Sequence, residues 1–206
     1  MLPTKTRLVA LLTVLAGALG AGTAQANLLD FQSCNNDPRA AVFARWADPM
    51  TYRLAPGGDF ESTPPGWETS GSANVVTGNE TYYIHSASDT HSLSLGSGAS
   101  ATSPETCVSL YEPVARFMVK STGSALGVLK VDALYRDSTG VLGVVPVGVV
   151  TGTGSGWQPS LPMELSLGLV PSAGADATNL RLRFTVSGVG GAFSIDDVYV
   201  DPFGRG

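Results

Sequence analysis

The side chains of this chain best suited to chemistry are two adjacent aspartates near its C-terminal end, Asp196 and Asp197. They interrupt the alternation of apolar and polar residues in the segment Phe193–Asp201, because the apolar residues before and after the pair fall on opposite faces of an extended strand. A β-bulge at the pair would let the strand bury both sets. Bulged residues leave the hydrogen-bonded ladder, and two carboxylates placed in this way suit a hard cation such as calcium.

Three short motifs follow one another along the chain and resemble carbohydrate-binding modules of the galactose-binding-like jelly-roll type. They are Gly-Gly-Asp-Phe-Glu at 57–61 with Gly-Trp at 66–67, His-Ser-Leu-Ser-Leu at 91–95, and Phe-Ser-Ile-Asp-Asp-Val at 193–198. The resemblance covers about residues 56–202. It implies a two-sheet jelly roll whose first and last strands meet at a calcium ion held by the side chains of Glu61 and Asp196, with Asp59 contributing its carbonyl oxygen. The alternative interpretation is that Glu61 and Asp196 are solvated surface acids.

A sugar-binding site needs an aromatic face for the apolar side of a pyranose and several polar groups for its hydroxyls. Both histidines lie near Asp89, but two histidines without a well-spaced third ligand make a poor zinc site. A tryptophan that follows a glycine, as Trp67 and Trp157 do, can instead plug the end of a sandwich core. The candidate ligand-binding residues are Tyr82, Tyr83, His85, Tyr111, Arg136 and Trp157.

The sequence shows no catalytic constellation. It contains no G-x-S-x-G elbow, no H-E-x-x-H motif, no phosphate-cradling glycine loop and no EF-hand loop. We therefore expect a non-catalytic protein. The less favoured alternative is a small secreted hydrolase, which needs two acids across a cleft, for example Asp132 and Glu164.

Short segments of period-two alternation, separated by Gly, Ser, Pro and Asp, predict the elements that must position these residues. The pattern is typical of half-buried antiparallel strands, and it indicates an all-β fold, an antiparallel β-sandwich of the jelly-roll type. Residues 141–150 have strand propensity but include Pro146, which favours an edge strand or a looped hairpin. The predicted core-facing sets are Leu93 and Leu95; Ala115, Phe117 and Val119; Leu129, Val131, Ala133 and Tyr135; Met163, Leu165, Leu167 and Leu169; and Leu180, Leu182, Phe184 and Val186.

The N-terminal part divides into a leader and an arm. Residues 1–26 have basic residues, a short apolar run and Ala24-Gln25-Ala26, which indicates a secretory signal peptide. Residues 27–55 form an N-terminal arm with a short helix predicted at 38–46, because Asp37 can cap that helix and Pro38 suits its first position. The domain proper then spans residues 56–206.

Composition and cysteine usage bound the environment and the partners. Removing the leader changes the formal net charge from −5 to −7, which argues against nucleic acid as a partner. No other stretch is apolar for long enough to be a membrane-spanning helix. The two cysteines, Cys34 and Cys107, would meet an oxidising environment after export, so we expect a disulfide between them; the alternative is two buried thiols.

The sequence therefore predicts a secreted, extracellular or cell-envelope β-sandwich with a structural calcium ion that binds a glycan or a cell-surface polysaccharide. The alternative from another class is a structural or adhesive envelope protein that kept the scaffold without sugar binding. An aromatic content of 8% favours that alternative, because binding clefts of this type expose several rings.

Overall fold

The computed structural model describes residues 38–62, 66–109, 114–136, 140–152, 154–165 and 177–201. The predicted leader, Cys34, Tyr111, Leu167 and Leu169 lie outside these residues. The described elements are the 3₁₀ turn η1 (Ala44–Trp46) and the strands β1 (Arg53–Leu54), β2 (Glu68–Ser70), β3 (Ala73–Thr77), β4 (His91–Leu95), β5 (Ser100–Thr102), β6 (Thr106–Ser109), β7 (Val114–Ser121), β8 (Val128–Arg136), β9 (Leu142–Thr151), β10 (Gln158–Pro159), β11 (Met163–Glu164), β12 (Ala177–Ser187) and β13 (Phe193–Asp201). The single described helical turn has three residues, and no described helix could cross a membrane.

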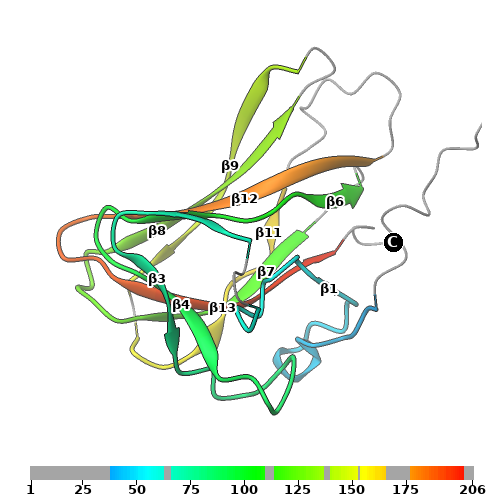
Figure 1. The fold of residues 1–206 in the computed structure, drawn as a ribbon. Helices are drawn as coiled ribbons and strands as arrows, with labels where there is room; N and C mark the ends of the chain where they lie inside the picture. Colours follow the sequence, from blue (N-terminus) through cyan, green and yellow to red (C-terminus); the bar gives the residue numbers. More distant parts are fainter. Residues whose placement is uncertain are drawn as a thin grey trace, which may run out of the picture.

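The strands form two antiparallel sheets that face each other as the layers of a sandwich (Figure 1). The seven-stranded sheet has the order β10-β7-β13-β4-β3, with β1 on β13 and β11 on β7. The six-stranded sheet has the order β2-β5-β12-β8-β9, with β6 on β12. The predicted all-β antiparallel sandwich is confirmed.

The core between the sheets includes the described residues that the period-two pattern assigned to it, together with residues of other segments such as Phe60, Trp67 and Ala101. Ala115, Phe117 and Val119 of β7 are buried, and so are the alternate residues of β8 and β12. The rings of Phe117 and Phe184, from opposite sheets, meet edge to face with centroids 5.0 Å apart. The period-two pattern predicted these buried residues correctly because each of these strands presents one face to this core.

The predicted bulge in β13 is present. The pairing of β13 with β7 shifts register between Asp196 and Tyr199, and Asp197 has a positive φ of 48°. Val198 and Val200, after the shift, are fully buried in the same core as Phe193 and Ile195, before it. The extra residue therefore resolves the conflict in parity that the sequence showed.

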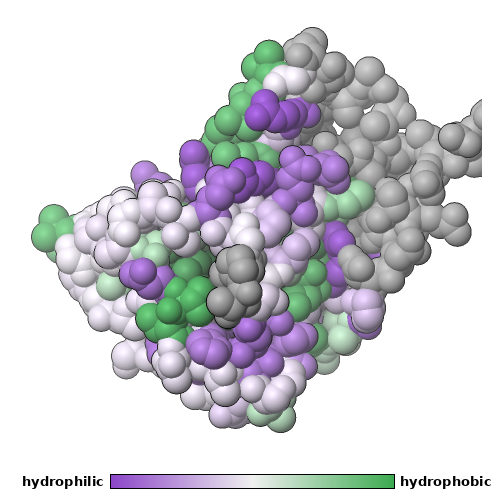
Figure 2. All heavy atoms as spheres, viewed as in Figure 1, coloured by the Kyte–Doolittle hydropathy of each residue, from purple (hydrophilic) through white to green (hydrophobic). Residues whose placement is uncertain are grey.

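Strand β9 lies at the edge of the six-stranded sheet, as Pro146 predicted, and its pairing with β8 is irregular where the proline occurs. Figure 2 shows apolar side chains gathered along this strand at the top of the view. Leu142, Val144 and Val149 are among the exposed ones. The proline cannot donate to a ladder, which suits a strand with one free side.

The N-terminal arm packs against the outer face of the seven-stranded sheet (Figure 1). The helix predicted at 38–46 is reduced to the single turn η1, because Ala40 pairs with Tyr52 as an antiparallel bridge and is therefore extended. Phe43 and Tyr52 form a second apolar cluster with Met118 of β7, on the face opposite to Phe117. Both faces of β7 are thus buried, although its sequence predicted a polar outer face.

Candidate functional site

The first and last sequence motifs meet in the structure. Gly58 lies against Val198, whose N–H donates to the Gly58 carbonyl at 3.0 Å. A Cβ on Gly58 would lie 2.7 Å from the Val198 carbonyl oxygen, so this close approach requires glycine. The contact brings the segment that carries Asp59 next to the bulge of β13.

Residues 78–90 form a loop that is fixed to β13 by two buried acids. The Glu80 N–H donates to Asp196 Oδ2 at 2.9 Å, and the Glu80 carboxylate accepts the N–H groups of Tyr82 and Ile84. Both acids are fully buried, and these hydrogen bonds offset part of the cost of their burial. The loop therefore holds its remaining polar residues beside the bulge.

His85 and Asp89 of this loop meet Asp197 in a group that we call the histidine–carboxylate group. Their ligand atoms all lie within 4.8 Å of one another. His85 Nδ1 lies 2.7 Å from Asp89 Oδ2 and 3.9 Å from Asp59 Oδ2. Asp197 is 1% exposed, and among the residues that the structure describes neither of its buried carboxylate oxygens has a hydrogen-bond partner.

The electrostatics of the group reflect buried negative charge. Burial raises the pKa of Asp197 to about 7, and the charges of Glu80 and Asp89 add to the effect. Burial also raises the pKa of Asp196 to about 9, together with the charge of Asp197. Burial lowers the pKa of His85, but its hydrogen bond and charge interaction with Asp89 outweigh this, so its pKa lies above the usual value. Each shift indicates that the site favours added positive charge.

The carboxylate oxygens of Glu61 and Asp196, the predicted calcium pair, accept hydrogen bonds in the structure. Glu61 Oε1 accepts the N–H groups of Thr90 and His91, and Glu61 Oε2 accepts from the Thr90 hydroxyl and lies 3.0 Å from His91 Nδ1. Both Asp196 oxygens accept backbone N–H groups. Asp59, the third predicted ligand, lies beside His85, and its Oδ1 accepts the Glu61 N–H. The buried carboxylate without a partner is therefore that of Asp197 and not that of Asp196.

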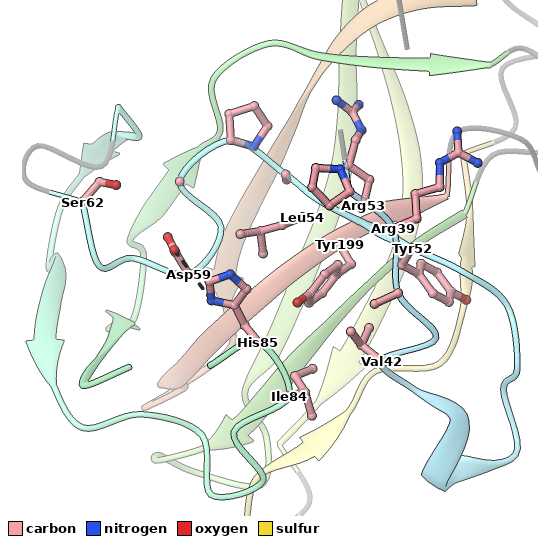
Figure 3. A pocket seen from close by; sticks show the side chains of 15 residues that line it. Arg39, Val42, Tyr52, Arg53, Leu54, Asp59, Ser62, Ile84, His85 and Tyr199 are labelled. Atoms are coloured by element: carbon pink, nitrogen blue, oxygen red, sulfur yellow. Dashed lines mark ion pairs between the residues drawn. The ribbon is translucent and has the colours of Figure 1, made fainter. Parts of the chain in front are cut away.

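A cavity of about 550 Å³ lies between the arm and the seven-stranded sheet. Figure 3 shows Asp59 and His85 pointing toward each other on one side of it, with Tyr199 beside them and Arg39 and Arg53 on the other side. Tyr199 is buried, and this burial raises the pKa of its hydroxyl. The negative charges of the nearby carboxylates raise this pKa further. The cavity thus has Asp59 and His85 on one side and two arginines on the other, and Arg53 donates to the Thr106 hydroxyl and the Cys107 carbonyl.

Two of the predicted ligand-binding residues lie exposed on the loop that carries His85. Tyr82 is 41% exposed and Tyr83 is 52% exposed. The Tyr82 ring meets Trp46 of the arm edge to face, at 5.0 Å between centroids, and the Arg45 guanidinium lies over both rings. We call Trp46, Tyr82 and the next residue of the loop, Tyr83, the aromatic rim.

Two other predicted ligand-binding residues, Arg136 and Trp157, lie elsewhere. Arg136 is exposed on β8 of the six-stranded sheet and lines a different cavity. Trp157 is buried in the cluster under the arm, with Lys120 over its ring, so it presents no open face to a sugar. Tyr111 lies outside the described residues. Asp132 pairs with Arg183 on the six-stranded sheet whereas Glu164 lies on the seven-stranded one, so these two acids do not face each other across a cleft.

Cys107 lies in β6. Cys34 is the only other cysteine of the chain, and it lies outside the described residues. The bridge between Cys34 and Cys107 therefore stays a prediction.

Sequence reasoning missed the parts of the site that come from the loop and the arm. Glu80 and Asp89 resemble solvated loop acids, and no local pattern marks their burial. The four-residue spacing of His85 and Asp89 and the adjacency of Asp197 to Asp196 were the available signs. Trp46 was not singled out because its partner Tyr82 lies far along the chain.

No protein-family model matches the chain, and no curated protein matches it. Its structure is similar to solved carbohydrate-binding modules, the class that the sequence motifs resemble. The CBM22-1 xylan-binding domain from Paenibacillus barcinonensis Xyn10C is 20% identical, with a TM-score of 0.47, over 71% of this chain and 91% of that chain. The family 11 module of the cellulosomal cellulase Lic26A-Cel5E of Clostridium thermocellum is 13% identical, with a TM-score of 0.42, over 73% and 94%.

A further similar structure contains the CBM22-1 and GH10 modules of the Clostridium thermocellum endo-1,4-beta-D-xylanase 10B, complexed with xylohexaose. It is 17% identical, with a TM-score of 0.48, over 66% of this chain and 26% of that chain. This protein thus spans about a quarter of the xylanase chain. At these identities and TM-scores the similarity assigns neither a family nor a ligand to this chain.

Proposed function

We propose that the protein is an exported, non-catalytic β-sandwich that binds a glycan or a cell-envelope polysaccharide at the mouth of the cavity between the arm and the seven-stranded sheet. The observations that carry the proposal are the exposed rings of Tyr82 and Tyr83 and a cavity of about 550 Å³ that is lined by His85 of the same loop. Export rests on the leader at 1–26 that the sequence predicts. The sequence also predicts a calcium ion, so glycan binding is tested both with calcium and with a chelator.

The rim and the cavity supply the two kinds of contact that a sugar needs. The exposed rings of Tyr82 and Tyr83 offer flat apolar surface for the C–H face of a pyranose. His85 and Asp59 on the near wall and Arg39 on the far wall can donate and accept hydrogen bonds with its hydroxyls. The cavity also falls in the size range of about 300–1,000 Å³ that small-molecule sites occupy.

A glycan and polysaccharide array with the oxidised protein tests the proposal, first with calcium and then with chelator. We expect saturable binding to one class of glycan. In the double variant Tyr82→Ala, Tyr83→Ala the affinity should fall by about 10-fold to 30-fold, because both rings of an aromatic contact are removed. Isothermal titration with the best ligand measures the change.

Arg136→Ala is the matched control. The sequence predicted Arg136 as a ligand-binding residue too, but Arg136 lines another cavity. The affinity of this variant should equal that of the unmodified protein. Loss of binding in Arg136→Ala, with full binding in the tyrosine variant, would indicate that the ligand binds at the six-stranded sheet instead. Absence of binding to every glycan by folded protein would contradict the proposed function.

The second candidate function is a structural or adhesive envelope protein. It is favoured by the arm, because Phe43 and Tyr52 cover the outer face of the seven-stranded sheet and so occupy surface that an open sugar-binding groove would need. The array separates the two candidates, since a purely structural protein binds no glycan in either the presence or the absence of calcium.

A further inference from the structure

The strongest unexplained feature of the site is the carboxylate of Asp197. A buried polar group without a hydrogen-bond partner costs about 1–3 kcal/mol, and an unpaired buried charge costs more. Asp197 carries this cost at 1% exposure, with both oxygens unpartnered. Asp197 lies in the β-bulge and has a positive φ, so an irregular backbone and a buried carboxylate occur at the same residue. This combination is frequent at ligand sites.

The surroundings of Asp197 add negative charge. Asp59, Glu80 and Asp89 all interact with it unfavourably, and His85 is its favourable partner. Within the part of the chain that the structure describes, no arginine or lysine forms a salt bridge with any of these acids. One histidine therefore faces several carboxylates, and a bound cation would neutralise the excess.

We propose that His85 Nδ1 and the carboxylates of Asp89 and Asp197 bind a divalent metal ion, with Asp59 beside them. The three ligand atoms already lie within 4.8 Å of one another, and they come from two segments that the Glu80–Asp196 hydrogen bond holds together. In the structure, His85 Nδ1 contacts Asp89 Oδ2 directly. On metal binding, both atoms would contact the ion instead of each other.

The ligand set also selects the class of ion. Calcium and magnesium prefer oxygen ligands alone, whereas zinc and manganese accept an imidazole nitrogen together with carboxylates. The site therefore takes an ion of the Zn²⁺ or Mn²⁺ class. Its three ligands differ from the calcium ligands expected at Glu61 and Asp196.

The site also adjoins the proposed ligand cavity, because His85 and Asp59 line that cavity whereas Asp197 is buried behind them. A metal ion here would keep its remaining coordination positions on the cavity side. The metal inference does not depend on glycan binding, since it rests on the geometry of His85, Asp89 and Asp197 and its test uses metal ions as the sole ligands.

The test is titration of the metal-stripped, untagged protein with Zn²⁺, Mn²⁺ and Ca²⁺, followed by calorimetry and by thermal melting. We expect saturable one-to-one binding of Zn²⁺ or Mn²⁺ and a rise of the melting temperature by several degrees, because the ion binds the folded state. Asp197→Asn and His85→Ala should each weaken binding by about 10-fold or more. Without metal, Asp197→Asn should melt no lower than the unmodified protein, because it removes a buried charge.

Two variants serve as controls. Glu61→Gln keeps full binding if the ion lies at Asp197, and Asp132→Asn changes a carboxylate on the other sheet. The inference is overturned if no ion binds saturably, or if binding survives Asp197→Asn or His85→Ala. Stabilisation by calcium alone that is lost in Glu61→Gln would also overturn it, and would instead support the site expected from the sequence.

Discussion

Replacing Phe43 by alanine should lower the free energy of unfolding by about 3–5 kcal/mol, the usual cost of truncating a buried phenylalanine. Phe43 is fully buried although it lies in the arm. Its ring meets Tyr52 and Tyr199 edge to face, with centroids 5.1 Å and 5.8 Å away, and the Arg116 guanidinium lies 4.6 Å from its centroid. Urea unfolding followed by tryptophan fluorescence measures the change.

Val189→Ala is the control for the Phe43 variant, because Val189 is 82% exposed and its truncation should change stability by less than about 0.5 kcal/mol. The result decides whether the arm belongs to the cooperative unit of the sandwich. A Phe43→Ala variant as stable as the control would mean that the arm unfolds separately, and the cavity beneath it would then be a transient feature.

The sequence predicted the sandwich because its strands bury one face in a shared core. Phe117, Leu182 and their alternate neighbours needed only a period of two to be assigned correctly. The bulge at Asp196 was predictable for a related reason, since four apolar residues in one strand could be buried together in no other way. In both cases the information is local to a few residues.

The arm and the site could not be predicted in the same way, because their partners are distant in sequence. Met118 and Arg116 are buried by Phe43 and Asp48, about seventy residues earlier, and no alternation records that contact. Asp196 and Asp197 are identical neighbours in the sequence, and aspartate tolerates a positive φ, so nothing in the sequence shows that Asp197 adopts it. The identity of the unpartnered carboxylate is therefore a property of the assembled fold.

Removing the carboxylate of Asp48 should have an effect as large as that of Phe43. Asp48 pairs with Arg116, and both side chains are largely buried. Asp48→Ala leaves the guanidinium of Arg116 buried without its anion, which costs about 3–5 kcal/mol. Asp132→Ala breaks the more exposed pair with Arg183 and should cost about 0.2–1 kcal/mol. Chemical unfolding of both variants measures the difference, and equal costs would contradict a buried arm.

The same pair predicts how stability depends on pH. Burial raises the pKa of Asp48, but hydrogen bonds from the Tyr52 hydroxyl and the Met50 N–H, together with Arg116, outweigh it, so the pKa lies below its usual value. As the pH falls, the Asp48 carboxylate is therefore protonated at a higher pH in the unfolded chain than in the folded protein. Its contribution to the free energy of unfolding is lost as the pH falls below about 4. Unfolding measured from pH 7 downward should show a shallower loss in Asp48→Asn than in the unmodified protein or in Asp132→Asn. Because all three proteins keep the acids around Asp197, the difference between their slopes reports Asp48 alone, and identical slopes would exclude this role for the pair.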